Sequence, residues 1–121
     1  MQRINDDIKT GQLKKIYLLC GEEAYLRKQY RDRLKEAIIG DDTLNYYYHE
    51  GKEISTGEII DLSETLPFFA ERRLILLENS GLFKSGGEEL ADYLKGDTGS
   101  TYFVFVEAEA DKRSRLYKTV K

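Results

Sequence analysis

The sequence predicts an α/β fold in which helices cover both faces of a parallel sheet. Four apolar or aromatic segments have centres about 28 residues apart, close to the roughly 30 residues of a β-α-β unit. Three of them are dense in Leu, Ile, Val and Phe, as strands covered on both faces require. The second is more polar and suits an edge strand. The predicted strands are residues 16–20, 45–49, 73–77 and 101–106.

Apolar residues at helical spacing predict helices between these strands. A short N-terminal helix carries Ile4 and Ile8 and stops at Gly11. The second helix begins at about Ala24 and stops at Gly40, because glycine favours the left-handed conformation at a helix C-terminus. Its apolar positions recur every four residues: Leu26, Tyr30, Leu34 and Ile38.

Capping residues predict where the later helices begin. Ser55 and Glu58 have the spacing of a capping box, and Pro67 closes the helix that follows. Ser85 and Glu88 form a second pair with the same spacing. We therefore expect the third and fourth helices to start at these two pairs.

Asp111 is the predicted cap of a last helix that carries a run of basic residues. These cations could face nucleic-acid phosphates, or they could form a solvated helix face. Because the chain ends in or just after this helix, we interpret the chain as a fragment of a longer protein. The basic residues are Lys112, Arg113, Arg115, Lys118 and Lys121.

Composition limits the class of protein. The 121 residues suffice for one domain with one core, and a net charge of -3 argues against a stand-alone nucleic-acid binder. No apolar run approaches the roughly 20 residues of a membrane helix, and the N-terminus has no apolar signal region. We expect a cytoplasmic protein with no membrane partner. The single Cys20 excludes an internal disulfide, and we expect no metal and no cofactor.

The turn after the first strand lacks the phosphate-binding loop of a nucleotide-binding α/β protein. Such a loop combines glycines with a lysine and a Ser or Thr. Gly21, Glu22 and Glu23 stand in its place, and a glutamate repels a phosphate. We interpret these residues as a degenerate phosphate loop that does not bind nucleotide.

Polar side chains near the carboxyl ends of the strands are candidates for an enzyme site. Clustered carboxylates can hold Mg²⁺ for phosphoryl transfer or nuclease chemistry, or they can be merely solvated. The glutamates in question are Glu22, Glu78, Glu107 and Glu109. Tyr46, Tyr47 and Tyr48 could stack on bases or form an amphipathic edge strand, and His49 has no catalytic partner that the sequence can identify.

Leu66, Pro67, Phe68 and Phe69 connect the third helix to the third strand. Two adjacent aromatic residues cannot easily both point inward from a short loop. An exposed large apolar side chain on a rigid turn is a typical docking anchor. The alternative is that both rings close the core at the end of the sheet.

Three segments together resemble the N-terminal domain of the bacterial DNA polymerase III delta subunit family: residues 16–26, 66–77 and 111–118. The resemblance covers essentially the whole chain. It implies one domain, residues 1–121, with a P-loop NTPase or AAA+-like three-layer sandwich and a degenerate phosphate loop. The helical lid and the C-terminal collar of the family are absent from this chain.

The resemblance also implies a non-catalytic subunit of the DNA polymerase III holoenzyme. Such a subunit binds the sliding clamp (beta subunit) and helps to open the ring for loading onto primed DNA during replication, without hydrolysing ATP. Its other partners are the gamma/tau and delta prime subunits. The clamp-binding motif of the family corresponds here to Leu66, Pro67, Phe68 and Phe69, and Glu64 and Thr65 stand where clamp-binding peptides often have glutamine.

Overall fold

The computed structural model describes residues 2–68 and 70–120, and it confirms the α/β fold. One parallel sheet has the strand order β1-β4-β3-β2, with β2 at an edge as predicted. Each strand agrees with its predicted bounds to within one residue at either end. The strands are β1 (Ile16–Cys20), β2 (Tyr46–Glu50), β3 (Arg73–Glu78) and β4 (Thr101–Glu107).

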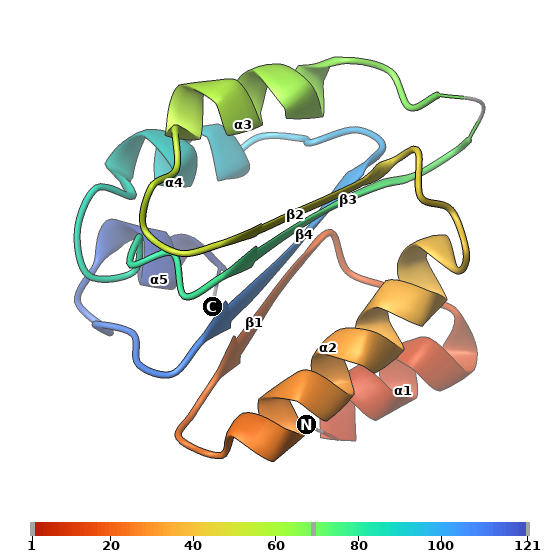
Figure 1. Ribbon diagram of the computed structural model, residues 1–121, viewed down its shortest axis with the longest axis horizontal. Coiled ribbons are helices and arrows are strands. Elements are labelled where there is room, and N and C mark those ends of the chain that lie inside the picture. The colour runs from red at the N-terminus through yellow and green to blue at the C-terminus, as the bar shows by residue number, and fades with distance from the viewer. Residues whose placement is uncertain (1, 69, 121) are drawn as a thin grey trace.

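Helices cover both faces of the sheet and make a three-layer arrangement (Figure 1). Helices α1 (Gln2–Thr10) and α2 (Ala24–Ile39) pack on one face. Helices α3 (Thr56–Glu64), α4 (Glu88–Leu94) and α5 (Arg115–Val120) pack on the other. No helix in the described parts of the chain is long and apolar enough to cross a membrane.

The central strands β3 and β4 contribute to two separate cores. In β3, Leu74 and Leu76 face α2, whereas Ile75 and Leu77 face α3 and α4. All four side chains are fully buried, because alternate residues of a strand point to opposite faces and both faces are covered. This explains the uninterrupted apolar run in the sequence.

The first capping prediction is confirmed and the second is wrong. Ser55 Oγ accepts a hydrogen bond from the Glu58 backbone N–H at 3.2 Å, and α3 follows. At α4 the cap is Gly87, and Ser85 makes no capping bond within the described chain. A Cβ at Gly87 would lie 2.4 Å from the Leu82 carbonyl oxygen, so close packing favours glycine at this cap position and α4 begins without a side-chain cap.

The predicted cap of the last helix is also wrong. Asp111 Oδ1 accepts a hydrogen bond from the Arg113 backbone N–H at 2.9 Å, which closes a turn ahead of the helix. Ser114 Oγ accepts from the Tyr117 backbone N–H at 3.1 Å. Ser114 therefore caps α5, which starts at Arg115.

Replacement of the two predicted capping serines should give different results. Ser55→Ala removes a helix cap and should lower the free energy of unfolding by about 1 kcal/mol. Ser85→Ala, the matched control, should change it by less than about 0.5 kcal/mol, because the exposed hydroxyl caps nothing. Urea unfolding followed by circular dichroism measures both. Equal losses would contradict the assignment of the caps.

Candidate functional site

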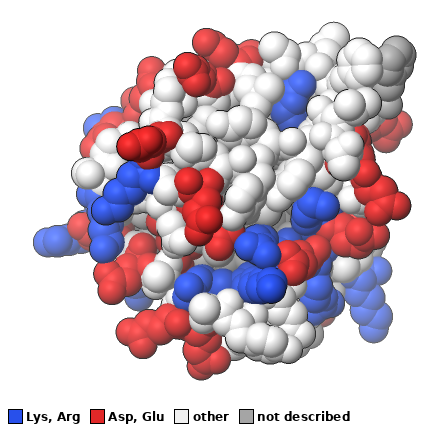
Figure 2. All heavy atoms as spheres, viewed as in Figure 1, with Lys and Arg blue, Asp and Glu red and all other residues white. Residues whose placement is uncertain are grey.

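The loop between α3 and β3 lies at the amino ends of the strands (Figure 1). It exposes large apolar side chains. Leu66 is 88% exposed and Phe68 is 57% exposed, while Pro67 between them is half-buried. Uncharged surface extends to the upper right of Figure 2, where Figure 1 places this loop. Phe68 therefore does not close the core. Phe69, the fourth residue of the predicted motif, lies outside the described residues.

Helix α3 ends earlier than the sequence predicts. Its last residue is Glu64, and Thr65 is already extended with φ −83° and ψ 155°. A proline disfavours the helical conformation of the residue before it, so Leu66 cannot continue the helix. Leu66 and Pro67 consequently belong to the loop.

The buried guanidinium of Arg73 holds the first half of this loop. It donates hydrogen bonds to the carbonyl oxygens of Leu62 at 2.5 Å, Thr65 at 2.7 Å and Leu66 at 3.1 Å. The C-terminal end of a helix leaves carbonyl groups short of backbone donors, and Arg73 supplies donors at this end of α3. The Leu62 carbonyl also accepts a hydrogen bond from the Thr65 backbone N–H at 3.2 Å. Burial lowers the pKa of the Arg73 guanidinium. The positive charge at a helix C-terminus is favourable for the helix dipole.

The buried side chain of Asn45 holds the second half. Its Oδ1 accepts a hydrogen bond from the Phe68 backbone N–H at 2.6 Å, and its Nδ2 donates to the Phe68 carbonyl oxygen at 2.8 Å. Nδ2 also donates to Asp42 Oδ2 at 2.8 Å. Hydrogen bonds from Asn45 and from the Leu44 backbone N–H hold the pKa of Asp42 below its usual range.

Sequence reasoning missed three residues around this loop. Arg73 was predicted only as the first residue of a strand, and Asn45 only as part of an edge strand. Leu44, which is 70% exposed, was not considered. Arg73 and Asn45 could have been found from their positions at the start of predicted strands. A polar residue that is buried there needs a hydrogen-bonding partner.

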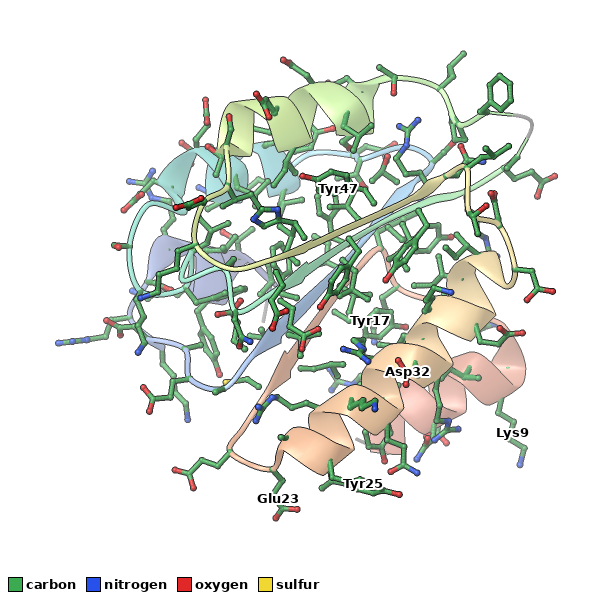
Figure 3. The ribbon with its side chains drawn as sticks, in the orientation of Figure 1. Lys9, Tyr17, Glu23, Tyr25, Asp32 and Tyr47 are labelled. Atoms are coloured by element: carbon green, nitrogen blue, oxygen red, sulfur yellow. The ribbon has the colours of Figure 1, made fainter. Side chains whose placement is uncertain are left out.

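The degenerate phosphate loop lies at the opposite, carboxyl end of the sheet. Gly21 has a φ of +148°, a conformation that favours glycine, and Glu22 and Glu23 are exposed. Glu23 and Tyr25 project outward where α2 begins (Figure 3). The Arg27 side chain donates a hydrogen bond to the Gly21 carbonyl. This turn is thus held by groups of the protein itself.

A second basic residue of α2 is also paired within the protein. Arg31 Nη1 lies 2.8 Å from Glu78 Oε1 at the end of β3, and the Tyr48 hydroxyl donates to the same oxygen at 3.0 Å. Burial, together with the hydrogen bond to Glu78 and its charge, raises the pKa of the Tyr48 hydroxyl to about 12.

Glu107, at the end of β4, is a buried carboxylate that shapes the loop after β3. Its Oε2 accepts hydrogen bonds from the Ser80 backbone N–H at 2.9 Å and from Ser80 Oγ at 3.0 Å. The Gly81 N–H approaches Oε1 at 3.4 Å. Burial raises the pKa of Glu107, although these hydrogen bonds oppose the change.

The glutamates predicted as an alternative metal site are engaged separately. Glu78 pairs with Arg31, Glu107 binds Ser80, and exposed Glu109 pairs with Lys84 at 3.0 Å. Within residues 2–68 and 70–120, no three His, Cys, Asp or Glu side chains form a group that could hold a metal ion. The geometry gives no support to a phosphoryl-transfer or nuclease site.

The residues of the predicted basic stretch do not share one environment, and neither do those of the predicted aromatic stretch. Arg113 pairs with Asp111 at 3.2 Å, and Arg115 pairs with Asp92 at 3.3 Å. Lys112 and Lys118 are exposed, and positive and negative side chains alternate over the face seen in Figure 2. Tyr46 packs with the α2 core and Tyr47 with the opposite core. Alternation along β2 thus places neighbouring tyrosines on opposite faces.

Glu107→Gln should reveal the effect of the buried charge. Because burial raises the pKa of Glu107 above the ordinary 4.5, the folded protein keeps this proton at pH values where the unfolded chain has lost it. The contribution of Glu107 to stability therefore falls as the pH rises. The difference in unfolding free energy, variant minus wild type, should increase between about pH 4 and about pH 7 in urea titrations. A decrease would mean that the Ser80 and Gly81 hydrogen bonds outweigh burial.

Comparisons with known proteins agree with this architecture. Residues 17–121 match the family described as DNA polymerase III, delta subunit. The chain is similar to DNA polymerase III subunit delta of Bacillus subtilis (strain 168), with 27% identity over 128 residues that cover 94% of this chain and 37% of the relative.

Among solved structures, the fold is similar to that of the Bacillus subtilis DNA clamp loader delta protein (YqeN). The TM-score is 0.84 at 24% identity, over 98% of this chain and 39% of that chain. The chain thus spans 37% of the curated relative and 39% of the solved one. Because the family match extends over nearly all of its residues, the chain belongs to the DNA polymerase III delta subunit family.

Proposed function

We propose that this chain is the clamp-binding domain of a clamp-loader delta subunit. The observation that carries the proposal is the loop on which Leu66 and Phe68 are exposed while buried polar side chains hold its backbone. Large apolar side chains on a rigid loop are typical anchors at protein interfaces. In this proposal Leu66, Pro67, Phe68 and Phe69 enter an apolar pocket on the sliding clamp (beta subunit).

Burial of the exposed apolar side chains would favour such a contact. Burial of a Leu or Phe side chain contributes roughly 1.5–3 kcal/mol, before the cost of ordering the loop is subtracted. A loop that is already held loses less conformational freedom on binding. If the loop binds the open form of the clamp better than the closed form, binding shifts the ring toward opening.

The domain has no catalytic part in this proposal. The glutamates of the degenerate loop repel phosphate, and the nearby arginines are paired with protein groups. In this proposal ATP acts through the gamma/tau subunits, and delta prime completes the loader. The assembled complex binds primed DNA in the cytoplasm. Residues 1–121 form the AAA+-like first domain, and the lid and collar belong to the rest of the subunit.

Substitution of Phe68 tests the proposed contact. Phe68→Ala should weaken binding to the sliding clamp of the same organism by about 2 kcal/mol, or about 30-fold, the effect of a central interface anchor. Tyr25→Ala is the matched control, because Tyr25 is an exposed aromatic residue at the opposite end of the sheet (Figure 3). Titration calorimetry measures both affinities. Equal affinity of Phe68→Ala and wild type would refute the proposed anchor.

Nucleotide and metal should leave the thermal stability unchanged. A ligand present at 100 times its dissociation constant would add about 2.7 kcal/mol to the free energy of unfolding. We expect millimolar ATP with Mg²⁺, and Mg²⁺ or Mn²⁺ alone, to change the melting temperature by less than about 1 °C, a shift worth only a fraction of a kcal/mol. Differential scanning fluorimetry with EDTA as the reference measures this. A clear rise with either addition would contradict the expectation that the domain binds neither nucleotide nor metal.

A further inference from the structure

We propose that Asn45 is the positioning residue of the clamp-binding loop and that Asp42 fixes the orientation of its amide. The inference rests on the proposed function for the identity of the partner. The positioning itself concerns the free protein and can be tested without the clamp.

The Asn45 amide holds Phe68 at two points. It accepts from the backbone N–H and donates to the carbonyl of the same residue, at 2.6 Å and 2.8 Å. Neither backbone group of Phe68 can rotate away without breaking one of these bonds. Asn45 immediately precedes β2 and is hydrogen-bonded to β3, because its own carbonyl accepts a hydrogen bond from the Leu74 N–H at 3.0 Å. The Asn45 side chain therefore attaches the second half of the loop to the sheet, as Arg73 attaches the first half.

Asp42 determines which way the amide faces. Asp42 Oδ2 accepts from Asn45 Nδ2 at 2.8 Å, and Asp42 Oδ1 accepts from the backbone N–H groups of Leu44 and Asn45 at 2.9 Å and 3.2 Å. A flipped amide would set its oxygen against the Asp42 carboxylate and the Phe68 carbonyl, two groups that can only accept. Both Nδ2 protons have acceptors, and the side chain is 3% exposed.

The chemistry of this contact requires asparagine at position 45. Aspartate could accept from the Phe68 N–H, but it would lack the donor and would face Asp42 and the Phe68 carbonyl with a negative charge. Alanine would lose both bonds. A loop that spends part of its time in other conformations binds more weakly. The apparent dissociation constant equals the intrinsic one divided by the fraction of molecules in the binding-competent conformation.

Amide exchange in the free protein is the first readout. Asn45→Ala should speed hydrogen exchange of the Phe68 amide roughly tenfold or more, as expected when two hydrogen bonds are lost. Asn45→Asp should do the same. The double variant Asn45→Asp/Asp42→Asn removes the repulsion between the two carboxylates, restores a hydrogen bond between the two side chains and keeps an acceptor for the Phe68 N–H, so part of the protection should return. Unchanged exchange in Asn45→Ala would overturn the proposal.

Clamp affinity is the second readout, measured by calorimetry on the same proteins. Asn45→Ala should raise the dissociation constant about threefold to tenfold, in line with the loss of the competent loop population. Val106→Ala is the control, because it truncates the core at the opposite end of the sheet and lowers stability without contact to the loop. It should leave the affinity unchanged.

The two readouts separate the possible failures. Faster exchange with weaker clamp binding in Asn45→Ala alone supports the positioning role. Equal weakening by Asn45→Ala and Val106→Ala, or faster exchange with unchanged affinity, overturns it. If the wild type does not bind the clamp, the proposed partner falls, and the exchange measurements still decide whether Asn45 holds the loop.

Discussion

The burial of β3 and β4 on both faces is the constraint on which the rest of the structure depends. Because their side chains fill two cores, polar residues are confined to the strand ends. Arg73 begins β3 and Glu107 ends β4, and both are buried. Each must find hydrogen-bonding partners in the adjacent loop, since a buried charge without partners is costly. The two loops at opposite ends of the sheet are shaped by this requirement.

The two ends of the sheet meet the requirement with different consequences. At the carboxyl end, Glu107 holds the loop at Ser80, and Arg31 and Glu78 neutralise each other. These three charged side chains are thus engaged with other groups of the protein. At the amino end, Arg73 donates to backbone carbonyls among the described residues, and Leu66 and Phe68 remain exposed. The domain thus presents an apolar surface at the end of the sheet where α/β proteins seldom bind small ligands.

The strands could be predicted because a run of apolar residues indicates a strand that is buried on both faces. The cap at Ser55 could be predicted from the spacing of Ser55 and Glu58. The prediction of a cap at Ser85 was wrong because it used only neighbouring residues, whereas Gly87 lies against the side chain of Leu116, which is distant in the sequence. Asp111 and Ser114 both carry cap-forming side chains, and the sequence does not show which one precedes the first helical turn. The adjacent aromatic residues beside a proline left open whether their rings are exposed or close the core, and the structure shows that Phe68 is exposed. The role of Asn45 could not be predicted, because its partner lies 23 residues away.

Polar rather than apolar contacts are suited to holding a docking loop. Packing against the core would fix the loop by burying the same side chains that a partner must reach. Hydrogen bonds to the backbone restrict the chain and leave Leu66 and Phe68 exposed. The hydrogen-bonding groups are themselves buried, so water competes little for them. The loop backbone can thus be held while the apolar side chains remain exposed. In the proposed clamp contact, the loop then loses little conformational entropy on binding, because folding of the domain has already ordered it.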